Sequence, residues 1–189
     1  AVDGEVLSGE FEVTPAGEGN HGPIRVANTY HFAYEDGTPY YSIGTTCYVW
    51  DLQSDERIAQ TLETLKNSAF NKIRFCVFPK HYVYNLKEPA QYPFEIRENS
   101  PWSPSDFETE KLEKAPRNMF GGIDAMIENP DEVWDYTRPN PSYFEHIENT
   151  IARLGTMGIQ ADLILFHPYD RWGYSRMNLE QQNFYLRYV

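Results

Sequence analysis

The chain has 189 residues, of which 41% are hydrophobic and 15% aromatic, and its 28 acidic against 16 basic side chains give a formal net charge of −12. This much apolar surface excludes a disordered acidic protein, and no run approaches the roughly 18 apolar residues that a transmembrane helix needs. The negative charge argues against nucleic acid as a ligand, because phosphates would be repelled, whereas neutral ligands such as sugars stay open.

Cys47 and Cys76 are the only cysteines. Two are too few for a disulfide framework or a zinc cage, and both lie in or beside apolar segments, so we expect buried free thiols. No secretory signal opens the given sequence, and this absence together with the free thiols favours a cytoplasmic location.

Short strands are expected near the start of the chain. Residues 1–20 are acidic and contain glycine, and we interpret them as a tail or the seam of a preceding module. Ile24–Asn28 and Tyr30–Tyr34 are typical of strands, and the Asp-Gly pair in Glu35–Thr38 predicts a hairpin turn, because glycine accepts a positive φ. The return strand is expected to enter Tyr40–Thr45.

A helix and a buried strand follow. Ser54 is the expected N-cap of a helix in which Ile58, Leu62 and Leu65 recur at helical spacing. The apolar run Lys72–Phe78, with its β-branched and aromatic residues, then predicts a buried strand.

A second helix is expected from about Pro141 to Met157, followed by a strand at Gln160–Phe166. Strand, helix and strand in this order predict a βαβ unit with a parallel sheet. The connection from Pro79 to Pro139 is much longer than an ordinary loop, and its many aromatic residues favour an ordered excursion over a disordered linker.

Asn178 is the expected N-cap of a last helix that reaches Val189 without a stop signal, so the sequence is expected to end within an element. Three parallel strands cannot bury both faces of their sheet, whereas eight such strands close into a (β/α)8 barrel of about 250 residues. We therefore predict an α/β fold: an incomplete (β/α)8 TIM barrel over residues 21–189, with about its first three βα units and a hairpin that plugs its bottom.

In such barrels the functional side chains follow the C-terminal ends of the strands. The residues expected there are rich in aromatic and hydrogen-bonding groups, a composition that stacks on sugar rings and binds their hydroxyls. The candidate substrate-binding residues are Trp50, Arg74, His167, Tyr169, Asp170 and Trp172.

Several candidates have a structural alternative. Trp50 and Trp172 could pack at the rim instead of stacking on a sugar. Arg74 lies within an apolar strand, so it must meet a carboxylate, either in the site or in a purely structural pair. His167 could be a core histidine, and Asp170 could form only a surface ion pair with the arginine that follows it.

Other chemistries lack their motifs. The sequence has no Gly-x-Gly-x-x-Gly, no Walker loop, no Gly-x-Ser-x-Gly elbow and no His-Glu-x-x-His. A metal site of Asp162, His167 and Asp170 matches no ligand spacing, so we expect neither a metal nor a cofactor. Glycoside hydrolysis needs two carboxyl groups, and no convincing pair is present.

Three stretches carry a family resemblance: Asp36–Thr46 with Tyr48 and Trp50, Phe70–Arg74 with Phe78-Pro79-Lys80, and Gly158–Asp170. They resemble the apiosidase-like glycoside hydrolases, a family similar to the clan of retaining (β/α)8 glycosidases. The resemblance extends from about Ile24 to Val189, and the last stretch is the most specific of the three.

The resemblance implies a glycosidase acting on plant or microbial polysaccharides, preceded by a β-sandwich module whose trailing edge is Ala1–Asn20. It implies that Arg74 and His167 help to shape the subsite for the cleaved sugar, that Arg74 supports the nucleophile and that Asp170 binds hydroxyls. In that clan the general acid follows strand four and the nucleophile follows strand seven. Both positions fall beyond Val189, so we expect no catalytic residue within this chain and no activity from it alone.

The expected ligand is an oligo- or polysaccharide, and neither nucleic acid nor a membrane is expected as a partner. The open sheet edge also predicts self-association or a complementing polypeptide. The alternative function is a non-catalytic carbohydrate-binding or truncated remnant protein, in which the same aromatic residues bind glycans weakly.

Overall fold

The computed structural model describes residues 8–82, 84, 85, 87–103, 127–168 and 170–189, and the chain divides into two compact units, Ala1–Ser42 and Ile43–Val189. None of the helices in these described ranges combines the length and the apolar character that crossing a membrane requires.

The first unit carries a three-stranded antiparallel sheet in the order β1-β2-β3. Its strands are β1 (Ile24–Ala27), β2 (His31–Tyr34) and β3 (Pro39–Tyr40). The predicted turn before β3 is confirmed, with Gly37 at a φ of 88°. The predicted return strand at Tyr40–Thr45 is wrong as one element, because the antiparallel sheet ends at Tyr40 and a parallel strand begins at Gly44.

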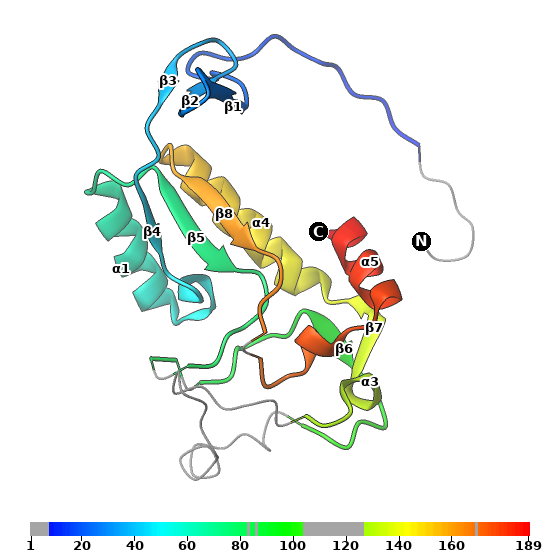
Figure 1. Cartoon of the computed structure of the whole chain (residues 1–189). Helices are drawn as coiled ribbons and strands as arrows, with labels where there is room; N and C mark the ends of the chain where they lie inside the picture. The colour runs from blue at the N-terminus through cyan, green and yellow to red at the C-terminus, as the bar shows by residue number, and fades with distance from the viewer. Residues whose placement is uncertain (1–7, 83, 86, 104–126, 169) are drawn as a thin grey trace. The chain divides into compact units, whose positions relative to one another are not determined.

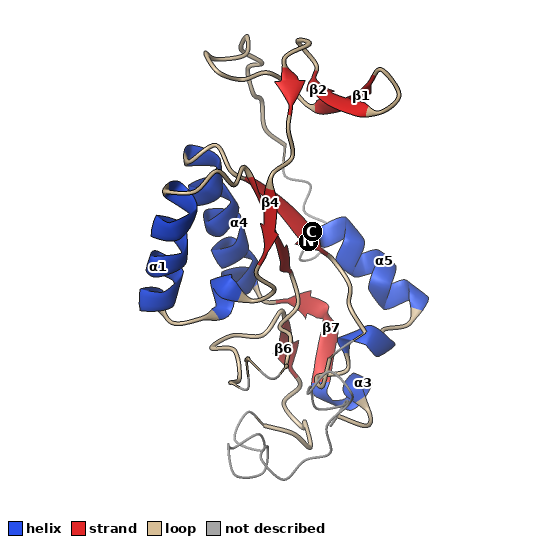
Figure 2. Ribbon diagram, turned by 60° about the vertical axis from the view of Figure 1, so that its left-hand side comes forward, coloured by secondary structure: helices blue, strands red, loops and turns tan. Residues whose placement is uncertain are grey.

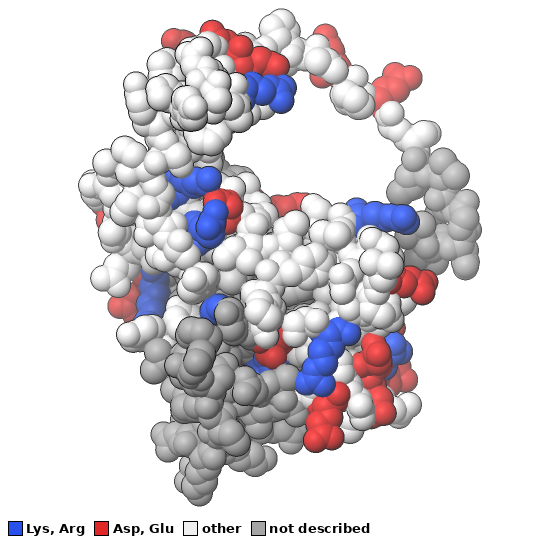
Figure 3. All heavy atoms as spheres, viewed as in Figure 1, with Lys and Arg blue, Asp and Glu red and all other residues white. Residues whose placement is uncertain are grey.

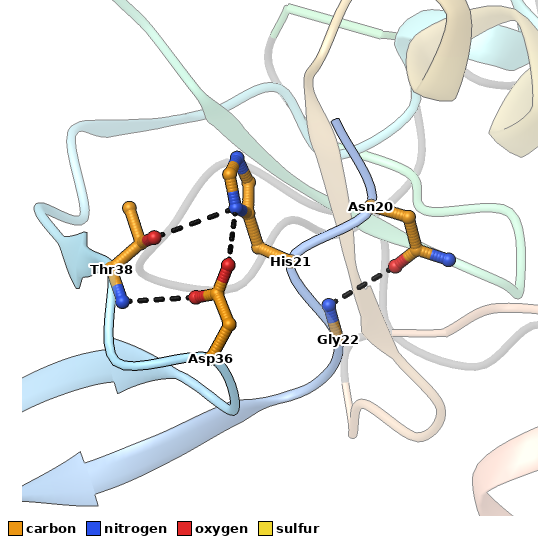
Figure 4. A network of polar contacts seen from close by, with 5 residues as sticks. All are labelled: Asn20, His21, Gly22, Asp36 and Thr38. Atoms are coloured by element: carbon orange, nitrogen blue, oxygen red, sulfur yellow. Dashed lines mark hydrogen bonds and ion pairs between the residues drawn. The ribbon is translucent and has the colours of Figure 1, made fainter. Parts of the chain in front are cut away.

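Polar contacts hold the turn between β2 and β3 (Figure 4). His21 Nδ1 lies 2.7 Å from Asp36 Oδ2, and the Thr38 backbone N–H donates to Asp36 Oδ1 at 2.9 Å. The hydrogen bond with His21, supported by those from Thr38, lowers the pKa of Asp36 to about 2. The ionised Asp36 therefore joins the segment before β1 to this turn.

The second unit contains a parallel sheet in the order β4-β5-β8 and a two-stranded antiparallel sheet, β6-β7. Its strands are β4 (Gly44–Thr46), β5 (Lys72–Cys76), β6 (Phe94–Ile96), β7 (Trp134–Pro139) and β8 (Gln160–Ile164). Its helices are α1 (Asp55–Lys66), α3 (Pro130–Val133), α4 (Pro141–Thr156) and α5 (Leu179–Tyr188), with 3-10 turns η1 (Trp50–Leu52) and η3 (Tyr174–Arg176).

The predicted βαβ order is confirmed, because β4, β5 and β8 pair in parallel. α1 begins directly after Ser54, whose Oγ accepts the backbone N–H of Arg57 at 3.5 Å. Asn178 caps α5 as predicted, and its Oδ1 accepts two backbone N–H groups at 3.0 Å. These caps supply acceptors for N–H groups that a helix leaves unpaired at its start.

α1 and α4 lie together on one face of the parallel sheet (Figures 1 and 2). Ile73 and Phe75 of β5 are fully buried and point into an apolar cluster with side chains from both helices, among them Leu62, Leu65 and Leu154. Because side chains alternate along a strand, Lys72, Arg74 and Cys76 face the opposite side of the sheet.

The described residues of the long connection after β5 form β6, α3 and β7, and residues 83, 86 and 104–126 lie outside the described ranges. A second core, rich in aromatic rings, ties this connection to the segment after β8. Within it the indole N–H of Trp134 donates to the carbonyl oxygen of Trp172 at 2.7 Å. The core therefore positions the loop that follows β8.

Candidate functional site

The sheet face opposite α1 and α4 carries charged side chains. Arg74 donates through Nε and Nη2 to Asp162 Oδ2 at 3.1 and 2.9 Å, and Lys72 Nζ lies 3.2 Å from the same oxygen. The side chain of Arg74 keeps 54% of its surface exposed. Figure 3 shows two basic groups beside one acidic group over β5 and β8.

Parallel register brings these groups together. Arg74 is the direct neighbour of Asp162 across β5 and β8, so the carboxylate that Arg74 was expected to meet is supplied by the next strand of the sheet. Burial raises the pKa of Asp162, but hydrogen bonds from Arg74 and Lys72 outweigh it and hold the pKa below its ordinary value. Two cations share one carboxylate, which leaves a surplus positive charge able to meet an anionic group on this face.

A second group of side chains gathers where β5 and β8 end. His167 is buried, with Nε2 3.4 Å from the carbonyl oxygen of Phe78, and its Nδ1 has no partner within the described ranges. Burial, aided by the charge of Lys80, lowers the pKa of His167, so the imidazole is neutral at pH 7. A neutral imidazole carries one donor and one acceptor, which suits a sugar hydroxyl.

Lys80 and Tyr48 lie at the same end of the sheet. Lys80 Nζ sits 4.5 Å from the centre of the Tyr48 ring, in the range of a cation–π contact. Burial lowers the pKa of Lys80. Both residues belong to the stretches that carry the family resemblance, but neither was among the candidate residues predicted from the sequence.

The structure gives Asp170 a local role. Its Oδ1 accepts the backbone N–H groups of Gly173 and Tyr174 at 2.6 and 3.1 Å, and its Oδ2 accepts that of Ser175 at 2.6 Å. Asp170 is buried and organises the turn that leads into η3. The binding of sugar hydroxyls by Asp170 stays a prediction.

The predicted surface ion pair between Asp170 and the next residue does not describe this loop, because Arg171 is fully buried and pairs with Glu88 of the long connection. Glu88 Oε2 also accepts from Tyr92 Oη at 2.6 Å and from the indole N–H of Trp172 at 2.8 Å. Glu88 thus joins the excursion to the loop after β8. Sequence reasoning missed it, although a lone acid among buried aromatic residues is a usable signal for a buried pair.

The two tryptophans of the predicted site are enclosed. Trp50 is 6% exposed and packs edge-on against Phe75 at a centroid distance of 5.8 Å, and Trp172 is fully buried beneath Arg171. Neither ring presents an open face in this structure, so stacking on a sugar by either residue stays a prediction. Tyr169, the remaining aromatic candidate, lies outside the described residues.

A groove of about 910 Å³ runs along β4 and α1, and its aromatic lining includes Tyr48, Tyr82 and Tyr84. Tyr82 contacts both of the other rings edge-to-face at centroid distances of 6.0 Å. Within the described ranges, no three His, Cys, Asp or Glu side chains gather closely enough to hold a metal ion.

Comparison with solved structures supports a glycosidase-like fold. A candidate glycoside hydrolase from Bacteroides vulgatus ATCC 8482 is 40% identical, with a TM-score of 0.72, and the match covers 95% of this chain but 31% of that one. A glycoside hydrolase family 5 protein from the same organism is 13% identical, with a TM-score of 0.53, and the match covers 89% of this chain and 30% of that one. This second likeness concerns the fold alone.

The chain therefore spans about a third of the structures it resembles. No curated protein matches it. The model of the apiosidase-like catalytic domain matches residues 26–189. Because this match covers far more than half of the sequence, the chain belongs to the apiosidase-like catalytic domain family.

Proposed function

We propose that this chain is the N-terminal part of a retaining glycoside hydrolase that acts on plant or microbial polysaccharides. The family match over residues 26–189 carries the proposal. The β4-β5-β8 sheet, with α1 and α4 on one face, supports its assignment to the first three βα units of a (β/α)8 barrel. On this proposal residues 21–189 belong to the barrel, and residues 1–20 trail from a preceding β-sandwich.

Arg74 and His167 are the proposed substrate-side residues of this segment. Arg74 holds a charge-assisted hydrogen bond to Asp162 yet stays half exposed, so it can also stabilise a catalytic carboxylate supplied by a later strand. His167, neutral and buried at the end of β8, is placed to bind a sugar hydroxyl. The catalytic carboxyl pair itself is proposed to lie in later residues, because in the resembled clan these groups follow strands four and seven and the described parallel sheet has three strands.

The test is polysaccharide hydrolysis by the polypeptide extended beyond Val189 in its own reading frame. We expect activity that falls about 10²-fold in kcat/KM for Arg74→Ala, because an aimed cationic donor is lost from the transition state. Arg153→Ala, an exposed arginine in the last turn of α4, is the matched control and should keep full activity.

Equal activity of the two arginine variants would refute the role of Arg74. Turnover by the 189-residue chain alone would refute the placement of the catalytic pair. Proton NMR of the first product should show retained anomeric configuration. Inversion would replace the proposed mechanism with a single displacement, in which one carboxylate activates a water molecule as the nucleophile.

The open sheet edges lead to a prediction about assembly. Within the described ranges β4 and β8 each pair with β5 alone, and a parallel strand edge readily recruits another strand. We expect the 189-residue chain to self-associate in sedimentation velocity unless a complementing polypeptide covers these edges. The extended polypeptide is the control and should sediment as a single discrete species. A stable monomer of the 189-residue chain at all concentrations would contradict the prediction.

A further inference from the structure

Asp51 is a buried carboxylate that the proposed reaction does not use. It lies in η1, in the loop that connects β4 to α1, and is 1% exposed. Neither of its carboxylate oxygens has a hydrogen-bond partner within the described ranges. Because an ionised carboxylate is costly to bury without a partner, this position favours the protonated acid.

The titratable groups around Asp51 come from three elements. Cys76 of β5 and Tyr143 of α4 interact with it electrostatically. Burial raises the pKa of the Cys76 thiol to about 12 and that of the Tyr143 hydroxyl well above its ordinary value, so both stay neutral. Asp55 of α1 and His146 of α4 line, with Asp51, a cavity of about 210 Å³.

The side chain of His146 holds the loop through the backbone of Asp51. Its Nε2 lies 2.7 Å from the carbonyl oxygen of Asp51, and because a carbonyl oxygen only accepts, Nε2 is the donor. Both ends of the loop are also anchored. The Cys47 N–H donates to the carbonyl oxygen of Arg74 at 3.0 Å, and the Tyr48 carbonyl oxygen accepts the N–H of Cys76 at 2.8 Å. At the other end Gln53 Nε2 donates to Asn85 Oδ1 at 3.0 Å. The hydrogen bonds between these anchors are weaker. The backbone N–H groups of Trp50, Leu52 and Gln53 donate within the loop at 3.3 to 3.4 Å, near the long limit of a hydrogen bond.

Between these anchors, burial and the His146 hydrogen bond hold the segment Trp50–Leu52 in place, and ionisation of Asp51 opposes its burial. Desolvation raises the pKa of Asp51 to about 7, against an ordinary value of 3.8. Opening of the loop would hydrate the carboxylate and return the pKa of Asp51 to its ordinary value. The population of the open form relative to the closed form should therefore grow about tenfold between pH 6 and pH 8, with most of the growth below pH 7.

We propose that the segment Trp50–Leu52 of this loop is a pH-sensitive element, closed while Asp51 is protonated and released from α4 when Asp51 ionises. The loop follows β4 at the end of the sheet where Lys80 and His167 lie, so its release would change the border of the candidate site. This inference concerns the loop alone and does not depend on glycosidase activity.

The test is amide hydrogen exchange of the 189-residue protein at pH 6, 7 and 8, followed by mass spectrometry and corrected for the intrinsic exchange rate. Protection of the amides of residues 50–53 should fall about tenfold from pH 6 to pH 8. In Asp51→Asn, which keeps the shape of the protonated acid, it should stay constant. Asp55→Asn removes the other carboxylate of the cavity and should behave like the wild type.

Two results would overturn the proposal. If protection of this loop in the wild type is the same at pH 6 and pH 8, Asp51 does not control the loop. This result can be obtained from the wild-type protein alone. A fall of the same size in Asp51→Asn would assign the change to another group, with His146 the nearest one left in place. Amides of α5 serve as the reference, because they are distant from the loop in the sequence and should show no such change.

Discussion

Glu88→Gln is expected to lower the free energy of unfolding of the 189-residue protein by about 3–5 kcal/mol, because it leaves the fully buried Arg171 without its counter-charge. Glu88 also accepts hydrogen bonds from Tyr92 and Trp172, and an amide oxygen can keep only neutral, weaker versions of these. Urea denaturation followed by tryptophan fluorescence measures the loss.

The exposed pair Arg25–Glu35 provides the matched control. Its atoms lie 3.2 Å apart, but both side chains are about 60% exposed, so Glu35→Gln should cost at most about 1 kcal/mol. The double variant Glu88→Gln/Arg171→Met should recover much of the loss, because no unpaired charge stays buried. If Glu88→Gln costs no more than Glu35→Gln, the buried pair does not hold the excursion to the loop after β8.

Asp51→Asn is expected to stabilise the protein increasingly as the pH rises. The pKa of Asp51 is raised to about 7 in the folded protein from an ordinary value of 3.8. Between these values the folded state holds a proton that the unfolded state has lost, so wild-type stability falls as the pH rises. The stability difference between Asp51→Asn and the wild type should therefore grow by roughly 3 kcal/mol from pH 5 to pH 8.

The comparison with a variant at each pH removes the contributions of all other titrating groups. Asp55→Asn, beside Asp51 in the cavity but exposed at the start of α1, should show a nearly constant difference from the wild type. A constant difference for Asp51→Asn as well would show that its carboxyl titrates alike in the folded and unfolded states. This equilibrium measurement is separate from the exchange experiment, which reports on the loop alone.

The helices α1, α4 and α5 and the strands β5 and β8 could be predicted from the sequence because their signals are local, whereas β6, α3 and β7 were not predicted. Ser54 and Asn178 cap helices in the structure as their positions predicted, and the apolar run that begins at Lys72 is a strand, buried on one face and exposed at Arg74 on the other. The boundary near Tyr40–Thr45 was missed because the strands Pro39–Tyr40 and Gly44–Thr46 are very short and only three residues separate them. Only their partners, β2 for one and β5 for the other, tell them apart.

The candidate site was harder to predict, because its contacts join residues far apart in the sequence. Asp162 was considered only as a poor metal ligand, yet parallel register places it beside Arg74, 88 residues away. Glu88 was not predicted, because it lies in a long connection without periodicity. It pairs with Arg171 only when that connection folds back onto the loop after β8. Asp51 was not among the candidates predicted from the sequence, since no local pattern shows that a polar residue is buried.

The sequence by itself determined the βαβ order, the caps of α1 and α5 and the family, because periodicity, capping residues and motifs act over a few neighbouring positions. The tertiary structure decided which charges meet, which tryptophans are enclosed and which carboxylate is kept from water. Those outcomes depend on strand register and on the packing of α4 and the excursion, and so on distances in space that no local pattern contains.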